Sequence, residues 1–86
     1  MAARKFTADE ARAIGDQLHI EWSQIDLEQF RMGLEVELEH GRRDPETDVT
    51  HDDPIVTGKI ALAHLREIPD YYTRLDRMEK EAEGKI

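Results

Sequence analysis

The chain has 86 residues and a mass of 10.0 kDa, so we expect one small domain and no second one. Its 20 acidic and 12 basic residues give a formal net charge of −8. Phosphate backbones are negatively charged and repel a protein with a negative net charge, so we expect no direct contact with nucleic acid. The absence of cysteine excludes disulfides, thiolate zinc sites and iron–sulfur clusters, so any metal would be held by histidine and carboxylate.

The sequence also gives no support for a membrane or secreted protein, nor for a hydrolase or a nucleotide-binding protein. No run approaches the roughly 18 apolar residues of a membrane span, and residues 1–7 lack the apolar core of a signal peptide, so we expect a cytoplasmic protein without a membrane partner. Ser23 is the only serine, and no glycine-rich phosphate cradle is visible. We therefore assign no catalytic and no cofactor-binding residue.

The first predicted helix covers residues 8–18. Thr7 and Glu10 fit a capping box, in which each side chain accepts a hydrogen bond from the backbone amide of the other residue. Phe6 stands where a hydrophobic staple would lie. Trp22 is expected to plug the core under the connection that follows. Apolar residues recur at the spacing of an amphipathic helix: Ala11, Ile14 and Leu18.

The second predicted helix covers residues 27–40. Asp26 is its expected N-cap, with Ile25 and Phe30 as a staple pair around it. Gly41 is expected to end the helix in the left-handed conformation. One face of this helix is apolar and is predicted to lie in the core: Leu27, Phe30, Leu34 and Leu38.

A long acidic loop is predicted over residues 41–53, which contain helix breakers and no periodic apolar residues. Pro54 suits the first position of a third helix, which extends to Ile68. Pro69 must kink or end that helix. A fourth helix over residues 70–83 is marked by a further apolar stripe: Tyr71, Leu75, Met78 and Ala82.

These elements predict an all-α fold, a single domain over residues 1–86 built as a bundle of about four short helices. Residues 1–6 are expected to be flexible. The second and third helices are expected to pack against one another, and the first and fourth to close the core.

Several motifs together resemble a known family. They are EVELEHG at residues 35–41, TGKIA at 57–61, His64-Leu65 with Glu67, and PDYY at 69–72 followed by Leu75. They are similar to a family of small acidic proteins of unknown function from bacteria, archaea and phages, over roughly residues 6–81. The resemblance implies a shared fold, and it carries over no catalytic or binding residue.

Glu37 with His40, and His64 with Glu67, are candidate metal ligands. Residues three apart on a helix project side by side, and helical bundles use Glu-x-x-His in this way. If the second and third helices run antiparallel, one register sets Glu37 beside Glu67 and His40 beside His64. The same register pairs Gly33 with Tyr71. Two carboxylates and two imidazoles would bind one iron, manganese or zinc ion.

The alternative for these four residues is structural. His40 in the last turn of a helix meets the negative end of the helix dipole, and Glu37 would pair with a basic residue nearby. His64 would be a core histidine that is hydrogen-bonded to a neighbouring carboxylate. A full two-metal bundle site also needs carboxylates from two further helices, and the first helix does not offer them.

Asp70 and Tyr72 are candidate partner-binding residues. Tyr71 is expected to pack in the core, while Tyr72 lies about 100° further round the helix. Tyrosine is enriched at interface hot spots. We therefore predict a non-enzymatic protein-binding or accessory module, which acts on a protein partner or through self-association because a thin core leaves apolar surface to cover. The alternative is a metal-binding protein that uses the His and Glu pairs.

Overall fold

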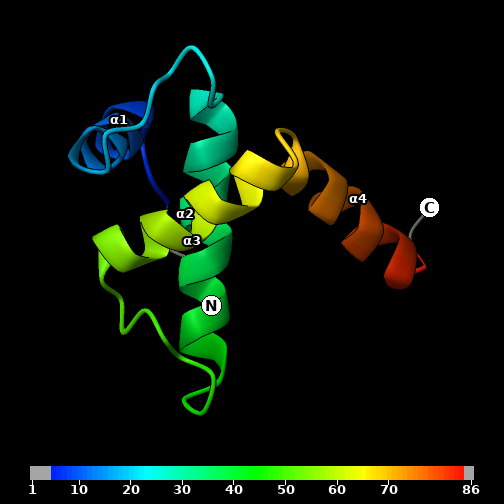
Figure 1. Ribbon diagram of the computed structural model, residues 1–86. Helices are drawn as coiled ribbons and strands as arrows, with labels where there is room; N and C mark the ends of the chain where they lie inside the picture. The colour runs from blue at the N-terminus through cyan, green and yellow to red at the C-terminus, as the bar shows by residue number, and fades with distance from the viewer. Residues whose placement is uncertain (1–4, 85–86) are drawn as a thin grey trace.

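The computed structural model describes residues 5–84, and its fold is all-α, as predicted. Four helices follow in chain order: α1 (Ala8–Gln17), α2 (Leu27–Arg43), α3 (Pro54–Glu67) and α4 (Tyr71–Ala82). Figure 1 shows α3 crossing α2, α1 on one side of the crossing and α4 projecting away on the other. No strand occurs within residues 5–84, and none of the helices there is long and apolar enough to cross a bilayer.

The packed part of the chain already includes Phe6. Its side chain is 3% exposed, and its backbone amide donates to Glu35 Oε2 at 2.8 Å. The predicted capping box follows: the Glu10 amide donates to Thr7 Oγ1 at 3.1 Å, and the Thr7 amide donates to Glu10 Oε1 at 2.9 Å. The flexible segment predicted over residues 1–6 stays a prediction, and residues 1–4 lie outside the described part of the chain.

Trp22 lies under the connection between α1 and α2, as predicted. Its ring meets Phe30 edge to face, with the ring centroids 5.8 Å apart, and its Nε1 donates to Asp16 Oδ1 at 2.9 Å. A Cβ on Gly15 would collide with this ring. The glycine inside α1, which costs helix propensity, therefore makes room for the tryptophan.

Helix α2 is longer than predicted. It begins after Asp26, whose carboxylate accepts from the Gln29 amide at 2.9 Å, and it continues through Gly41 to Arg43. The left-handed ending predicted at Gly41 is wrong. Gly41 is buried because the following loop folds back on it, and a Cβ there would lie 2.6 Å from Thr50 Oγ1. The loop accordingly covers residues 44–53 rather than 41–53.

Small residues let α3 come close to α2 where the two helices cross. A Cβ on Gly33 would lie 2.9 Å from Ala61 Cβ, and one on Gly58 would lie 3.3 Å from Phe30 Cζ. The predicted core face of α2 is buried apart from Leu27, which is half-buried. The largest fully buried side chains are Phe30, Leu34, Leu38, Thr57, Leu65 and Tyr72.

Pro69 separates α3 from α4. Helix α3 starts after Asp53, whose Oδ1 accepts from the Ile55 amide at 2.8 Å, and it ends before Ile68. A tight turn follows, in which the Tyr71 amide donates to the Ile68 carbonyl at 3.0 Å. Because proline cannot continue the α3 hydrogen-bond ladder, the chain changes direction here and α4 leaves the body of the molecule (Figure 1).

Candidate functional site

Four side chains from three helices meet where α4 begins, and we name them the α4 junction: Glu37, His64, Tyr71 and Tyr72. The Tyr72 hydroxyl donates to Glu37 Oε2 at 2.9 Å, and His64 Nε2 lies 3.5 Å from the same oxygen. The His64 ring stacks on the Tyr71 ring, with centroids 4.3 Å apart and planes 2° apart. The Tyr72 ring meets both of these rings edge to face. The junction thus ties the first turn of α4 to α2 and α3.

The polar contact inside the junction is shielded from water. The Glu37 side chain is 11% exposed and Tyr72 is 1% exposed. Burial raises the pKa of the Tyr72 hydroxyl, and the negative charge of Glu37 raises it further. Tyr72 therefore keeps its proton at neutral pH and stays a hydrogen-bond donor to the carboxylate.

Gln29 of α2 caps the start of α4 from outside the helix. Its Oε1 accepts from the Tyr72 amide at 3.1 Å, and its Nε2 donates to Thr73 Oγ1 at 2.6 Å. Asp70 stands at the N-cap position, and its side chain makes no capping hydrogen bond. A side chain 43 residues away in sequence thus satisfies an amide that is usually capped locally.

The four predicted metal ligands do not come together as the antiparallel register required. Because α3 crosses α2, Glu37 meets His64, while His40 and Glu67 are exposed. Within residues 5–84 no three His, Asp or Glu side chains converge on a point that could hold a metal ion. His64 instead fits the structural alternative, a histidine beside a neighbouring carboxylate.

Both tyrosines pack, and Tyr72 is the more deeply buried of the two. Tyr72, expected to face outward, is fully buried, and Tyr71 is half-buried at the surface. The glycine predicted to make room for a ring does so for Tyr72: a Cβ on Gly33 would lie 2.5 Å from Tyr72 Cε2. Tyr72 is therefore not accessible to a partner in this conformation.

Asp70, the other predicted partner-binding residue, is exposed. Its Oδ1 accepts from Arg74 Nε at 2.7 Å, and this hydrogen bond lowers the pKa of the Asp70 carboxyl. A role of Asp70 in binding stays a prediction.

A row of apolar side chains runs outward from the junction along α4, and we name it the α4 strip: Ile68, Tyr71, Leu75 and Met78. These residues and Arg74 line a shallow hollow of about 170 Å³. Ile68 is 38% exposed and Met78 is 58% exposed, while Tyr71 and Leu75 are half-buried. Tyr71 and Leu75 pack on the core with one side, whereas Met78 is open to solvent because the outer part of α4 projects beyond the body of the molecule (Figure 1).

The core face predicted for the fourth helix is confirmed at Tyr71 and Leu75, which pack on the core, and is wrong at Met78 and Ala82, which are exposed. Helical spacing shows that Tyr71, Leu75, Met78 and Ala82 share a face, and it does not show what that face packs against. Only the turn at Pro69 decides the direction of α4. The composition of the helix already indicated this, because six of the nine residues from Arg74 to Ala82 are charged. That leaves too few apolar positions for a helix covered on two sides.

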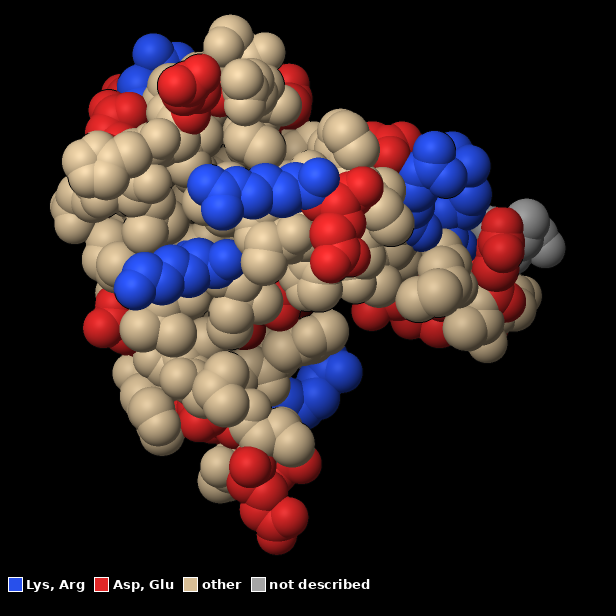
Figure 2. Space-filling model, viewed as in Figure 1, with Lys and Arg blue, Asp and Glu red and all other residues tan. Residues whose placement is uncertain are grey.

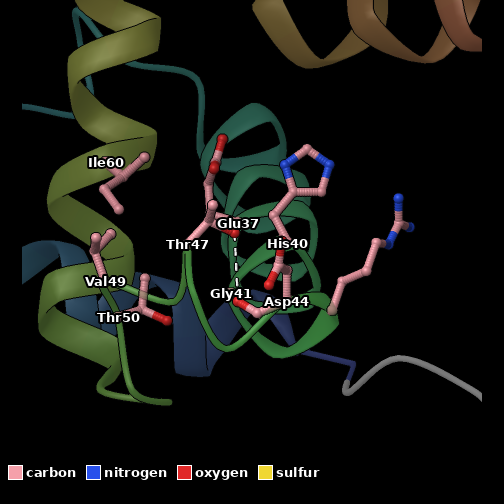
Figure 3. A pocket seen from close by; sticks show the side chains of 9 residues that line it. Glu37, His40, Gly41, Asp44, Thr47, Val49, Thr50 and Ile60 are labelled. Atoms are coloured by element: carbon pink, nitrogen blue, oxygen red, sulfur yellow. Dashed lines mark hydrogen bonds between the residues drawn. The ribbon is translucent and has the colours of Figure 1, made fainter.

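A second hollow of about 420 Å³ lies between the end of α2, the loop over residues 44–53 and α3. Figure 3 shows His40 and Asp44 beside it, with Ile60 and Val49 across from them. Glu37 also lines it, so the hollow adjoins the α4 junction. The full lining is Glu37, His40, Gly41, Arg43, Asp44, Thr47, Val49, Thr50 and Ile60. Acidic and basic groups both contribute, and neither sign dominates.

Charged side chains of both signs are interspersed over the face of the molecule that Figure 2 shows. Figure 2 shows blue and red groups side by side on the face in view, including the region of α4. Ion pairs within α4 account for part of this pattern, since Arg74 pairs with Asp70 and Lys80 Nζ lies 2.9 Å from Asp76 Oδ2. The net charge of −8 is therefore not gathered into one acidic face on this side.

Comparison with known families identifies the chain. It belongs to the family described as protein of unknown function (DUF5661), whose model matches residues 11–81. The family resemblance seen in the motifs is thus confirmed at the level of an uncharacterised family. Neither the curated proteins nor the solved structures contain a match to the chain.

Proposed function

We propose that the protein is a non-enzymatic protein-binding module that contacts its partner through the α4 strip. One observation carries the proposal: a helix fixed at its base lines a shallow apolar hollow with Tyr71, Leu75 and Met78, and Met78 at its outer end is 58% exposed. Single exposed apolar residues are common on protein surfaces, whereas a contiguous row on a projecting element is typical of an interaction surface.

The spacing of the α4 strip supports this proposal. Within α4, Tyr71, Leu75 and Met78 follow one another at intervals of four and three residues, the pattern of anchors that a helix lays into an apolar groove. Ile68 adds an apolar side chain just before the turn at Pro69. Met78 adds a flexible, polarisable side chain that adapts to a partner surface.

The fixed base of α4 supports it as well. The Tyr72 to Glu37 hydrogen bond and the Gln29 cap hold the first turn of α4 on α2. A contact surface held in place before binding loses less conformational freedom when the complex forms. The buried contact between Tyr72 and Glu37 thus has a role in binding without touching the partner.

The metal-binding alternative gains no support from this geometry. It needs Glu37, His40, His64 and Glu67 around one ion, and the junction brings only Glu37 and His64 together. Within the junction these two groups and Tyr72 already contact one another.

Site-specific photo-crosslinking in the native host tests the proposal. A photoreactive amino acid at Met78 is expected to give a covalent protein adduct that mass spectrometry identifies. The same group at Arg77, the exposed neighbour about 100° round the helix, is the matched control and is expected to give none. No adduct from position 78, or equal adducts from both positions, would contradict the proposal.

A further inference from the structure

We propose that the occupant of the α4 strip is the α4 helix of a second copy of this chain, packed antiparallel in a two-fold symmetric dimer. The inference rests on the proposed function, because it names the partner of the same strip. A two-fold interface must be self-complementary, so that each residue of the patch meets its counterpart twice. Helix α4 meets this requirement in its apolar and in its charged positions.

The apolar positions form a short coiled-coil seam. Tyr71, Leu75, Met78 and Ala82 are separated by four, three and four residues, the spacing of core positions in a heptad pattern. In an antiparallel pair centred between Leu75 and Met78, Leu75 faces Met78 of the second copy. Tyr71 then faces Ala82 of the second copy, so that the largest side chain of the seam meets the smallest. Alternating large and small residues in this way fills an interface evenly.

The charged positions beside the seam match in the same register. Arg74 borders the strip and would face Glu81 of the second copy, and the two-fold axis repeats this pair. Both side chains are exposed. Arg74 contacts Asp70 through Nε, and the guanidinium carries two further nitrogens that can donate to a second carboxylate. Opposite charges that flank an apolar seam set the partner and the orientation of paired helices.

The placement of α4 favours the antiparallel orientation over the parallel one. The helix leaves the body at its N-terminal end, and its last turn lies far from the body (Figure 1). An antiparallel pair puts the two bodies at opposite ends, whereas a parallel pair would bring both bodies to the same end. Antiparallel helices also set the positive end of one dipole beside the negative end of the other. Since the strip is short, we expect a weak, concentration-dependent dimer rather than an obligate one.

Sedimentation velocity on the purified full chain, from about 10 µM to about 1 mM, measures this association. Arg74→Glu places two carboxylates opposite one another in the pair, and Glu81→Arg places two guanidinium groups opposite one another. Each variant alone is expected to weaken dimerisation at least about tenfold. An equimolar mixture of the two restores opposite charges at both positions and is expected to dimerise. Both substitutions are on exposed positions, and circular dichroism checks that the variants fold.

The outcomes separate the inference from the proposed function. A wild-type chain that dimerises, with two monomeric variants that dimerise when mixed, supports the antiparallel pair. A strictly monomeric wild-type chain overturns the inference, and if Met78 still crosslinks to a different protein in the host, the proposed function stands without it. Dimerisation of Glu81→Arg alone as strong as that of the wild type also overturns the inference, because in a parallel pair Arg74 would face Glu79 instead.

Discussion

The Tyr72 hydroxyl donates to Glu37 Oε2 at 2.9 Å and so joins two residues that are 35 positions apart in sequence. This bond is almost fully shielded from water, and it links the first turn of α4 to the middle of α2. The orientation of the whole projecting helix, and with it the α4 strip, depends on contacts of this kind at its base.

Tyr72→Phe is expected to destabilise the protein by about 1.5–3 kcal/mol, because it keeps the ring and removes a hydrogen bond to a charged acceptor. Urea unfolding at pH 7 measures the change. Tyr71→Phe is the matched control, since the ring stacked on His64 remains and the Glu37 hydrogen bond is intact. If both variants lost the same free energy of unfolding, the hydrogen bond to Glu37 would not be the cause of the destabilisation.

The stability of the protein is expected to fall with rising pH above about 10. Burial and the Glu37 charge hold the pKa of Tyr72 above its usual value of 10.0 in the folded state, so the unfolded chain loses this proton first. Below that pH both states keep the proton and the full stability is present. Above it, this one group lowers the free energy of unfolding by up to about 1.4 kcal/mol per pH unit.

Urea unfolding midpoints between about pH 9 and about pH 11 check this dependence. Tyr72→Phe should show a shallower fall than the wild type, and Tyr71→Phe should keep the steep one. Parallel curves for the wild type and Tyr72→Phe would contradict the assignment of the effect to Tyr72.

Gln29→Ala is expected to loosen the start of α4. The variant leaves the Tyr72 amide without its acceptor and Thr73 without its partner, a loss similar to that of a helix cap, typically about 1 kcal/mol. Hydrogen exchange should speed up for the α4 amides and stay unchanged in α1. Thr73→Ala, which leaves the Tyr72 amide bonded, should have a smaller effect, and exchange rates in α4 that do not change would speak against a capping role.

Gly33→Ala is expected to destabilise the protein by about 1–3 kcal/mol through overpacking, although alanine is the better helix former by about 1 kcal/mol. The new Cβ would lie 2.5 Å from Tyr72 Cε2 and 2.9 Å from Ala61 Cβ. Thermal unfolding measures the loss. Glu39→Ala, at an exposed position of the same helix, is the control and should be close to neutral. A stabilised Gly33→Ala protein would show that the crossing of α2 and α3 has room for an added methyl group.

The sequence predicted the helices well because their ends are encoded locally. The capping box at Thr7, the N-cap at Asp26 and the start at Pro54 each depend on residues within one turn of the helix end. Gly41 was misread for the opposite reason. Its neighbour in space is Thr50 on the returning loop, and no local rule shows that a loop will cover a helical glycine.

The candidate site could be predicted only in part. Glu37, His64 and Tyr72 were all singled out by residue type, and the structure brings these three together. The pairing was wrong because the sequence gives the faces of two helices and not the angle at which they cross. The expected antiparallel packing would place Glu67 beside Glu37. Because α3 instead crosses α2 steeply, His64 is the neighbour of Glu37. The cytoplasmic location stays a prediction.

The accessibility of the Met78 methyl group tests the central claim, a helix fixed at its base with an open apolar strip, most directly. Methyl relaxation by a soluble paramagnetic agent in dilute solution measures it, with the buried Leu38 methyl groups as the internal reference. We predict strong relaxation at Met78 and Ile68, little at Leu38, and growing protection of Met78 as the protein concentration rises. A Met78 methyl as protected as Leu38 in dilute solution would mean that α4 folds back onto the body, and would contradict the account.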